Sequence, residues 1–148
     1  MNRRVDDLIK ELYPYLADVA ALLGRPRQSF SLLKETEVPE TAGLYVIYRE
    51  DPFEVLYVGK ARRRSKPSAS NQPDGLRFRI MRNHLAYQGN DNFVRYLMED
   101  IGLTSRSEAR AYIRNECSVQ WLEIEDSQRL FILEHQAIAA TSPRYNRG

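Results

Sequence analysis

Two short runs of strand-forming residues, separated by a turn signal, constrain the fold of this chain most. The runs cover residues 44–48 and 55–58, and both are rich in β-branched and aromatic side chains. Between them, residues 49–53 contain the turn-forming pair Asp51-Pro52. The pattern predicts a β-hairpin with a five-residue loop.

The expected hairpin would bring two tyrosines together. A loop over residues 49–53 pairs Ile47 with Val55 and Tyr45 with Tyr57. Directly opposed residues of an antiparallel pair point to the same face, so the two phenols would lie side by side. Tyrosine is also a common strand residue, and an ordinary structural role therefore stays open for both.

The rest of the chain predicts helices around this hairpin. Helical spacing of apolar residues predicts helices over residues 5–23, 76–87, 92–102 and 105–116. Ser105, followed by Glu108, is expected to cap the last of these, and Asp126 to cap a further helix to about residue 141. Alternation predicts a third strand over residues 118–124. We therefore expect an α+β fold, with a small three-stranded antiparallel sheet flanked by helices and an extra N-terminal helix. Residues 1–38 would form a helical extension of a domain over residues 39–148.

Length and composition narrow the class of protein. A chain of 148 residues is expected to form one domain with a modest core. No apolar run approaches the ~18–20 residues that span a membrane, and no signal-peptide core follows Met1. The single cysteine, Cys117, excludes an internal disulfide and is expected to be a core residue. These features predict a cytoplasmic protein that does not bind membranes.

Positive charge is concentrated in one segment. The net charge is only +2, but residues 60–95 carry nine Lys and Arg against two Asp. Such a patch is expected to dock on a polyanion. Residues 61–75 are polar, basic and rich in Ser and Pro, and they predict a long loop that orders on phosphate. The expected nucleic-acid contacts are Arg62, Arg63, Arg64, Lys66, Arg77 and Arg82.

The last helix carries an acidic residue on its apolar side. Glu134 lies in the same row as Leu130 and Ile138, at a spacing of four residues. A carboxylate that points toward a core is costly unless a cation or a metal ion pairs with it. One carboxylate, water and a substrate phosphate suit Mg²⁺. An arginine partner is the alternative that the sequence leaves open.

Several motifs in fixed order resemble the GIY-YIG nuclease family. They are Gly43-Leu44-Tyr45, Tyr57-Val58-Gly59, Leu76-x-x-Arg79, Glu134 and Asn146, and the resemblance covers roughly residues 39–148. Leu44 and Val58 replace the isoleucines of the family name, and both changes are apolar. The resemblance implies a Mg²⁺- or Mn²⁺-dependent endonuclease that hydrolyses DNA, with RNA not excluded as the substrate.

The resemblance also implies roles for individual residues. Tyr45 would act as the general base or orient the water, with a pKa depressed by a nearby cation or metal. Tyr57 would support it or contact the phosphate, and Lys60 would lower the pKa of a tyrosine or touch the phosphate. Arg79 would hold the phosphate in its guanidinium fork. Glu134 would be the metal ligand, and Asn146 would fix the wall of the active site.

The sequence does not decide whether His84 has a catalytic role. Related enzymes often carry a histidine four residues after the catalytic arginine, where this chain has Asn83. His84 comes one residue later, so in an α-helix it would point about 100° away from that position. Whether His84 or Asn83 faces the site stays open, and His135 is expected on a helix surface.

Two other readings compete with the nuclease. The chain can be a non-catalytic module that binds nucleic acid through the basic segment on the same fold. It can also be an interaction protein that forms a homodimer through the helix over residues 5–23. The sequence does not decide whether that helix covers the core or pairs with a second copy.

Overall fold

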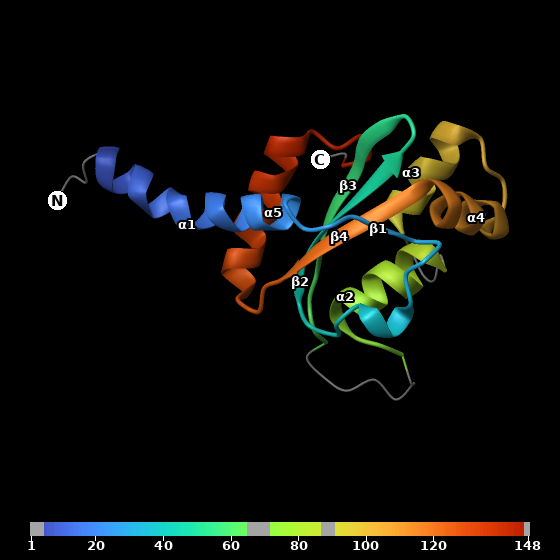
Figure 1. Cartoon of the computed structure of the whole chain (residues 1–148), viewed down its shortest axis with the longest axis horizontal. Coiled ribbons are helices and arrows are strands. Elements are labelled where there is room, and N and C mark those ends of the chain that lie inside the picture. Colours follow the sequence, from blue (N-terminus) through green and yellow to red (C-terminus); the bar gives the residue numbers. More distant parts are fainter. Residues whose placement is uncertain (1–4, 65–71, 87–90, 147–148) are drawn as a thin grey trace.

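The computed structural model describes residues 5–64, 72–86 and 91–146, and it has helices on both faces of one antiparallel sheet (Figure 1). The strands lie in the order β1-β4-β2-β3. They are β1 (Gln28–Ser29), β2 (Gly43–Glu50), β3 (Phe53–Ala61) and β4 (Cys117–Glu123). The α+β prediction is confirmed, but the sheet has four strands where the sequence predicted three. The missed strand, β1, has only two residues, too few for any alternating pattern.

The hairpin is present, but its turn is shorter than predicted. Glu50 pairs with Phe53, so only Asp51 and Pro52 lie between the strands. The peptide bond between Asp51 and Pro52 is cis. The predicted loop over residues 49–53 was therefore too long, because the flanking residues continue the ladder of the sheet.

A bulge then changes the register farther along the hairpin. The register shifts between Ile47 and Tyr48, so that Ile47 pairs with Tyr57 and Tyr45 pairs with Gly59. The predicted pairing of Tyr45 with Tyr57 was wrong by two residues. A shift of two keeps each side chain on its face. The phenols are still neighbours, with ring centroids 6.2 Å apart.

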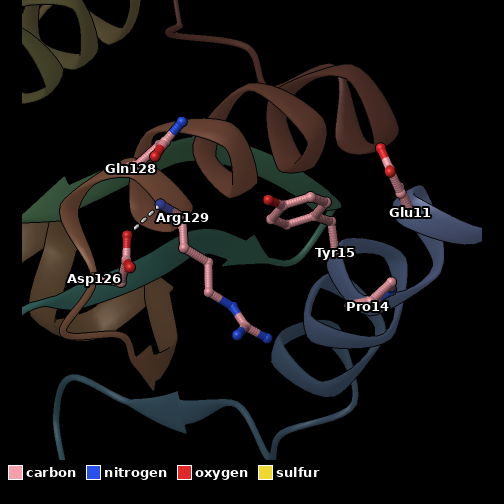
Figure 2. A pocket seen from close by; sticks show the side chains of 6 residues that line it. All are labelled: Glu11, Pro14, Tyr15, Asp126, Gln128 and Arg129. Carbon is pink, nitrogen blue, oxygen red and sulfur yellow. Dashed lines mark hydrogen bonds between the residues drawn. The ribbon is translucent and has the colours of Figure 1, made fainter. Parts of the chain in front are cut away.

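Helices α1 (Val5–Leu23) and α5 (Ser127–Thr141) cover one face of the sheet. Only the second half of α1 packs there: Val19 and Leu22 are buried, whereas Leu12 and Leu16 are about half exposed. Arg129 of α5 bridges the two helices, and its Nε donates to Asp18 at 2.7 Å. Figure 2 shows this side chain between the helices, at a pocket that Tyr15 also lines.

The other face is covered by the helices that follow the hairpin. They are α2 (Gly75–Arg77), the π-helix η2 (Phe78–Leu85), α3 (Asn92–Ile101) and α4 (Arg106–Glu116). Ser105 and Asp126 accept hydrogen bonds from the first turns of α4 and α5, so both predicted caps are confirmed. The predicted helix 76–87 is present in position but is mostly not an α-helix.

The second half of the predicted N-terminal extension is part of the core. Phe30, Leu33 and Val38 are buried with the residues of β2, next to the short 3₁₀ turn η1 (Glu35–Glu37). Cys117 is buried, as expected. Within the described part of the chain, no helix is both long and apolar enough to cross a membrane.

Candidate active site

Four of the predicted site residues meet under the hairpin. Tyr45 on β2 and Tyr57 on β3 point to the face that η2 covers, and η2 contributes Arg79 and His84. The Tyr45 hydroxyl lies 2.5 Å from Nε2 of His84. The imidazole ring is 5.3 Å from the ring of Tyr45 and 5.6 Å from that of Tyr57. Tyr45 and His84 are both almost completely buried.

Gly59 makes room for this arrangement. A Cβ atom added at Gly59 would collide with the hydroxyl end of Tyr45 and would lie 2.7 Å from a ring carbon of Tyr57. Because Gly59 is paired with Tyr45 across the hairpin, the phenol can lie over the glycine backbone. Position 59 of the Tyr57-Val58-Gly59 motif therefore requires a glycine, because a side chain there would collide with the two tyrosines.

The π-helix brings His84 to the site. In an α-helix the residue four positions after Arg79, Asn83, would share its face, and the sequence predicted His84 to be about 100° off. Residues 78–85 instead form a π-helix, in which hydrogen bonds join residues five apart and the wider turn brings such residues closer to one face. Arg79 and His84 are five apart, and both lie near Tyr45. The sequence left open whether His84 or Asn83 faces the site, and the π-helix places His84 against the Tyr45 hydroxyl.

Sequence reasoning missed one residue of this cluster, Asp91. Its Oδ2 lies 2.6 Å from Nδ1 of His84, and both side chains are buried. Its Oδ1 accepts a hydrogen bond from the backbone N–H of Val94 and caps α3. An Asp before a predicted helix signals a cap. Nothing in the sequence pairs that cap with a histidine on the preceding helix.

Arg79 is a partly buried cation with an unused buried donor. Tyr45 is close enough to its guanidinium to raise the pKa of Arg79. Its Nε is buried and has no hydrogen-bond partner among the described residues. An orphaned donor on a buried cation is costly, and an anion can satisfy it.

Burial gives Tyr45 the opposite pKa shift from the one predicted. Removal of the phenol from water raises the pKa of Tyr45 well above its ordinary value, and the charge of Arg79 offsets this only in part. Burial also raises the pKa of Tyr57, with the carboxylates of Asp91 and Glu134 adding to it. Tyr45 is therefore a neutral phenol near neutral pH, and it can relay a proton but does not start as a phenolate.

Lys60 and Glu134 pair on the other face of the hairpin. Nζ of Lys60 lies 3.1 Å from Oε1 of Glu134, and both side chains are largely buried. The ammonium also lies 5.1 Å from the ring centroid of Phe131. The partner that the sequence required for Glu134 is thus a lysine. Tyr57 lies on the edge strand β3. The negative charge of Glu134 is close enough to raise the pKa of Tyr57.

The donor set fits a metal ion only in part. Glu134 supplies one half-buried carboxylate at the sheet edge, which is enough for Mg²⁺ when substrate and water supply the other oxygens. The described residues contain no group of three or more His, Cys, Asp or Glu that would hold an ion by themselves. Metal binding would therefore depend on substrate, and Lys60 would have to share or leave Glu134.

Asn146 holds the edge strand in place. Its side-chain oxygen accepts from the N–H of Val58 at 2.8 Å, and its amide donates to the carbonyl of Val58 at 2.8 Å. The backbone of Tyr145 donates to Leu56, and its ring is buried. Asn146 thus fixes the segment that carries Tyr57 and Gly59, and it does not reach the buried cluster itself through any of these bonds.

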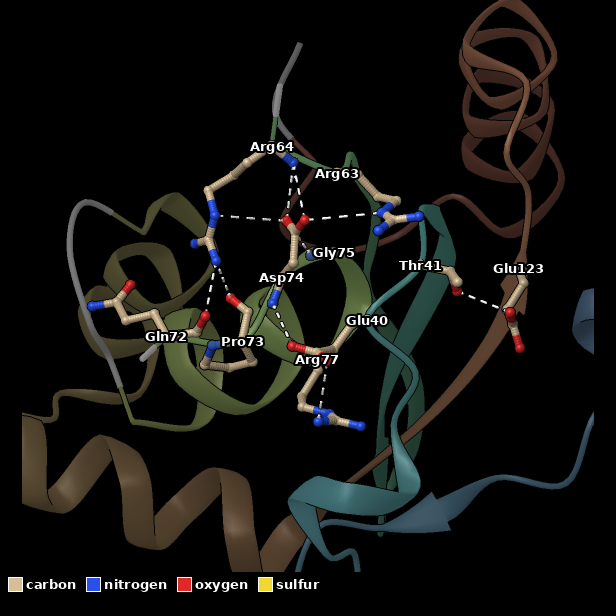
Figure 3. A network of polar contacts seen from close by, with 10 residues as sticks. All are labelled: Glu40, Thr41, Arg63, Arg64, Gln72, Pro73, Asp74, Gly75, Arg77 and Glu123. Carbon is tan, nitrogen blue, oxygen red and sulfur yellow. Dashed lines mark hydrogen bonds and ion pairs between the residues drawn. The ribbon is translucent and has the colours of Figure 1, made fainter. Parts of the chain in front are cut away.

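The basic loop is tied to the start of α2 (Figure 3). The backbone N–H of Arg64 donates to the carboxylate of Asp74 at 3.0 Å, and its guanidinium donates to the carbonyls of Gln72 and Pro73. Arg63 also points to Asp74, at 3.9 Å. Arg64 therefore closes the loop.

Other predicted nucleic-acid contacts are engaged within the chain. Nε of Arg77 donates to the carbonyl of Val38 at 2.7 Å, and Nε of Arg82 donates to Glu35 at 2.6 Å. Arg62 is exposed on the loop. Lys66 lies outside the described residues. The predicted patch is thus less available to a polyanion than its charge count indicated.

A second group of arginines, not predicted as nucleic-acid contacts, lies at α4. Arg110 and Arg114 are exposed, and with Arg82 and Glu35 they line a pocket beside η2. The two arginines are four residues apart on α4, so they share one face of that helix. This spacing was visible in the sequence, but its position beside η2 was not.

Comparison with known proteins does not assign the chain to a family. No family model matches it, and no curated protein matches it. The cluster of Arg79, Tyr45, His84 and their neighbours is therefore the main evidence for its function.

Proposed function

We propose that this chain is a metal-dependent endonuclease that hydrolyses phosphodiester bonds of DNA, as its resemblance to the GIY-YIG nucleases implies. The row of Arg79, Tyr45 and His84, of which the last two are buried, supports the proposal. Arg79 has a buried donor that awaits an anion, and the guanidinium fork suits phosphate oxygens. The same guanidinium contacts a phenol that in turn contacts an imidazole, which is a route for a proton.

The proposed reaction begins when a substrate phosphate binds Arg79. Because Tyr45 is buried in the free protein, the site must open when the phosphate binds, so that water can reach the phenol. The water then gives a proton to the Tyr45 oxygen, while the phenolic proton passes to Nε2 of His84. The hydroxide forms a bond to phosphorus, the bond to the leaving oxygen breaks, and that oxygen takes a proton from solvent. This route needs no phenolate in the free protein.

Glu134 would hold the Mg²⁺ or Mn²⁺ ion beside this row. The bound ion would stabilise the negative charge that develops on the phosphate. Lys60, released from Glu134, would be free to contact a phosphate oxygen. Tyr57, between the two groups, would donate a hydrogen bond to the phosphate.

The experiment is nicking of supercoiled plasmid by the purified protein, with Mg²⁺ or with EDTA. We expect cutting only with Mg²⁺, and a loss of roughly 100-fold or more in Glu134→Gln, which keeps the shape but not the charge. Glu99→Gln, at an exposed position of α3, is the matched control. Arg79→Lys should lose a similar factor, because it removes the fork that holds the phosphate.

Other outcomes would change the proposal. If Glu134→Gln cuts as well as wild type, Glu134 is not the metal ligand. Salt-sensitive binding of plasmid without any cutting would favour the non-catalytic binding module. The same assay on a single-stranded RNA of equal length would test RNA as the alternative substrate.

A further inference from the structure

Asp91, which pairs with His84, has no role in the reaction proposed above. Oδ2 of Asp91 lies 2.6 Å from Nδ1 of His84, and the two side chains are 2% and 1% exposed. The remaining neighbours of the imidazole include the rings of Tyr57 and Phe93, at 5.6 and 5.3 Å. A carboxylate is thus the polar contact on the side of His84 away from Tyr45.

The donors and acceptors in this row can have only one order. An ionised carboxylate only accepts hydrogen bonds, so Nδ1 of His84 must carry the proton that faces Asp91. In the neutral imidazole, Nε2 is then an acceptor, and the hydroxyl of Tyr45 donates to it. Arg79 can only donate, so its guanidinium, which lies near the same phenol, can approach only the oxygen of that hydroxyl. Asp91 at one end and Arg79 at the other therefore fix the direction of every bond between them.

We propose that Asp91 is a positioning residue that keeps the proton of His84 on Nδ1, so that Nε2 is free to take the proton of Tyr45. This inference rests on the proposed function of the site. When the phenolic proton passes to Nε2, His84 becomes an imidazolium with a proton on each nitrogen. Asp91 then faces the new positive charge directly and stabilises it. Asp91 itself does not take up the proton.

Asp91 also has a purely structural role, and the test must separate the two. Its Oδ1 accepts from Val94 N at 3.4 Å at the start of α3. Asparagine caps helices about as well as aspartate. Asp91→Asn therefore keeps the cap and removes the charge. Asp91→Ala removes both, so the difference in stability between Asp91→Ala and Asp91→Asn reports the cost of losing the cap.

The first measurement is the tautomer of His84 by ¹⁵N NMR of labelled imidazoles. The chain has two histidines, and His135 is exposed, so His135→Gln assigns the signals and serves as the background. In the wild-type sequence we expect a proton on Nδ1. In Asp91→Asn we expect it to move to Nε2, because the amide group donates to Nδ1. A wild-type imidazole protonated on Nε2 would overturn the proposal.

The second measurement is the rate of DNA cutting at saturating substrate. Asp91→Asn should lower kcat by roughly 10²–10⁴-fold, the range expected when a histidine is held in the wrong tautomer, with little change in KM. The tautomer and the rate must change together. A changed tautomer with an unchanged rate, or a slower rate with an unchanged tautomer, would each overturn the proposal.

The two proposals can fail separately. If the wild-type chain cuts no DNA, the endonuclease assignment fails, and the tautomer comparison alone then decides whether Asp91 positions His84. If the chain cuts DNA but Asp91→Asn matches wild type in both measurements, the endonuclease stands and the role of Asp91 is refuted.

Discussion

Gly59 and Tyr45 depend on each other at the scale of single residues. The phenol occupies the volume that a side chain at position 59 would need, and a Cβ there would also press on Tyr57. The two residues are paired across the hairpin, so the backbone at position 59 lies directly under the phenol. Any side chain at position 59 must therefore push Tyr45 away from His84.

Gly59→Ala tests this dependence. We expect a loss of about 1–3 kcal/mol in the free energy of unfolding, the usual cost of an overpacked core. Urea unfolding of the variant and of wild type measures it. In a Tyr45→Ala background the added methyl group meets only the ring of Tyr57, and it should therefore cost less. Equal costs in both backgrounds would contradict the steric role of Gly59.

Some of these residues could be predicted from the sequence, and others could not. The partial burial of Glu134 followed from its row on an apolar helix face, and its cation partner followed from that burial. That partner, Lys60, could not be identified, because it depends on how α5 crosses the hairpin. The raised pKa of Tyr45 was missed for a similar reason: depth of burial is set by the covering helix, not by the strand itself.

At the scale of elements, η2 controls which side chains reach the site. An apolar pattern predicts a helix at this position, but it does not distinguish a π-turn from an α-turn over eight residues. Hydrogen bonds of the π type change the angle between Arg79 and the residues after it. The caps were easier to predict, because Ser105 and Asp126 act within their own turns.

Exchange of two adjacent residues tests the importance of the π-helix. The double variant Asn83→His/His84→Asn puts the histidine four residues after Arg79. In the π-helix it is His84 that contacts the Tyr45 hydroxyl, so we expect cutting to fall to the level of His84→Asn alone. Circular dichroism controls for folding. Activity close to wild type would mean that the helix adapts to the histidine and that its π form is not decisive.

At the scale of the whole molecule, α1 extends beyond the sheet (Figure 1). Its inner half is anchored by Val19 and Leu22, whereas Val5, Leu12 and Leu16 are exposed. An isolated helix of this length is marginal in water, and packing usually supplies its stability. A second copy of the chain is the partner that the sequence analysis left open for this apolar surface.

Paired substitutions in α1 test that partner. Leu22→Ala should cost about 2–5 kcal/mol of unfolding free energy, because it empties a buried site. Leu12→Asp should leave the core intact and instead lower the self-association measured by sedimentation. A wild-type chain that sediments as a monomer at every concentration would contradict pairing through α1.

The distribution of charge over the molecule indicates which surface would bind DNA. The basic segment over residues 60–95 is less available than its composition suggested, because Arg64 closes its own loop and Arg82 is paired. Arg110 and Arg114 are exposed, and with Arg82 they line a pocket beside η2, the helix that carries Arg79. We therefore expect these two arginines to contact DNA phosphates.

The double variant Arg110→Ala/Arg114→Ala should weaken DNA binding at low salt. Each phosphate contact releases counterions, so the slope of log K against log salt should become shallower by about 0.9 per lost contact. Fluorescence anisotropy of a labelled duplex over a salt series measures this slope. Lys10→Ala/Arg25→Ala removes the same charge from exposed positions in and just after α1, and it should leave the slope unchanged. If both double variants flatten the slope equally, binding follows the net charge of the molecule rather than a defined surface at α4.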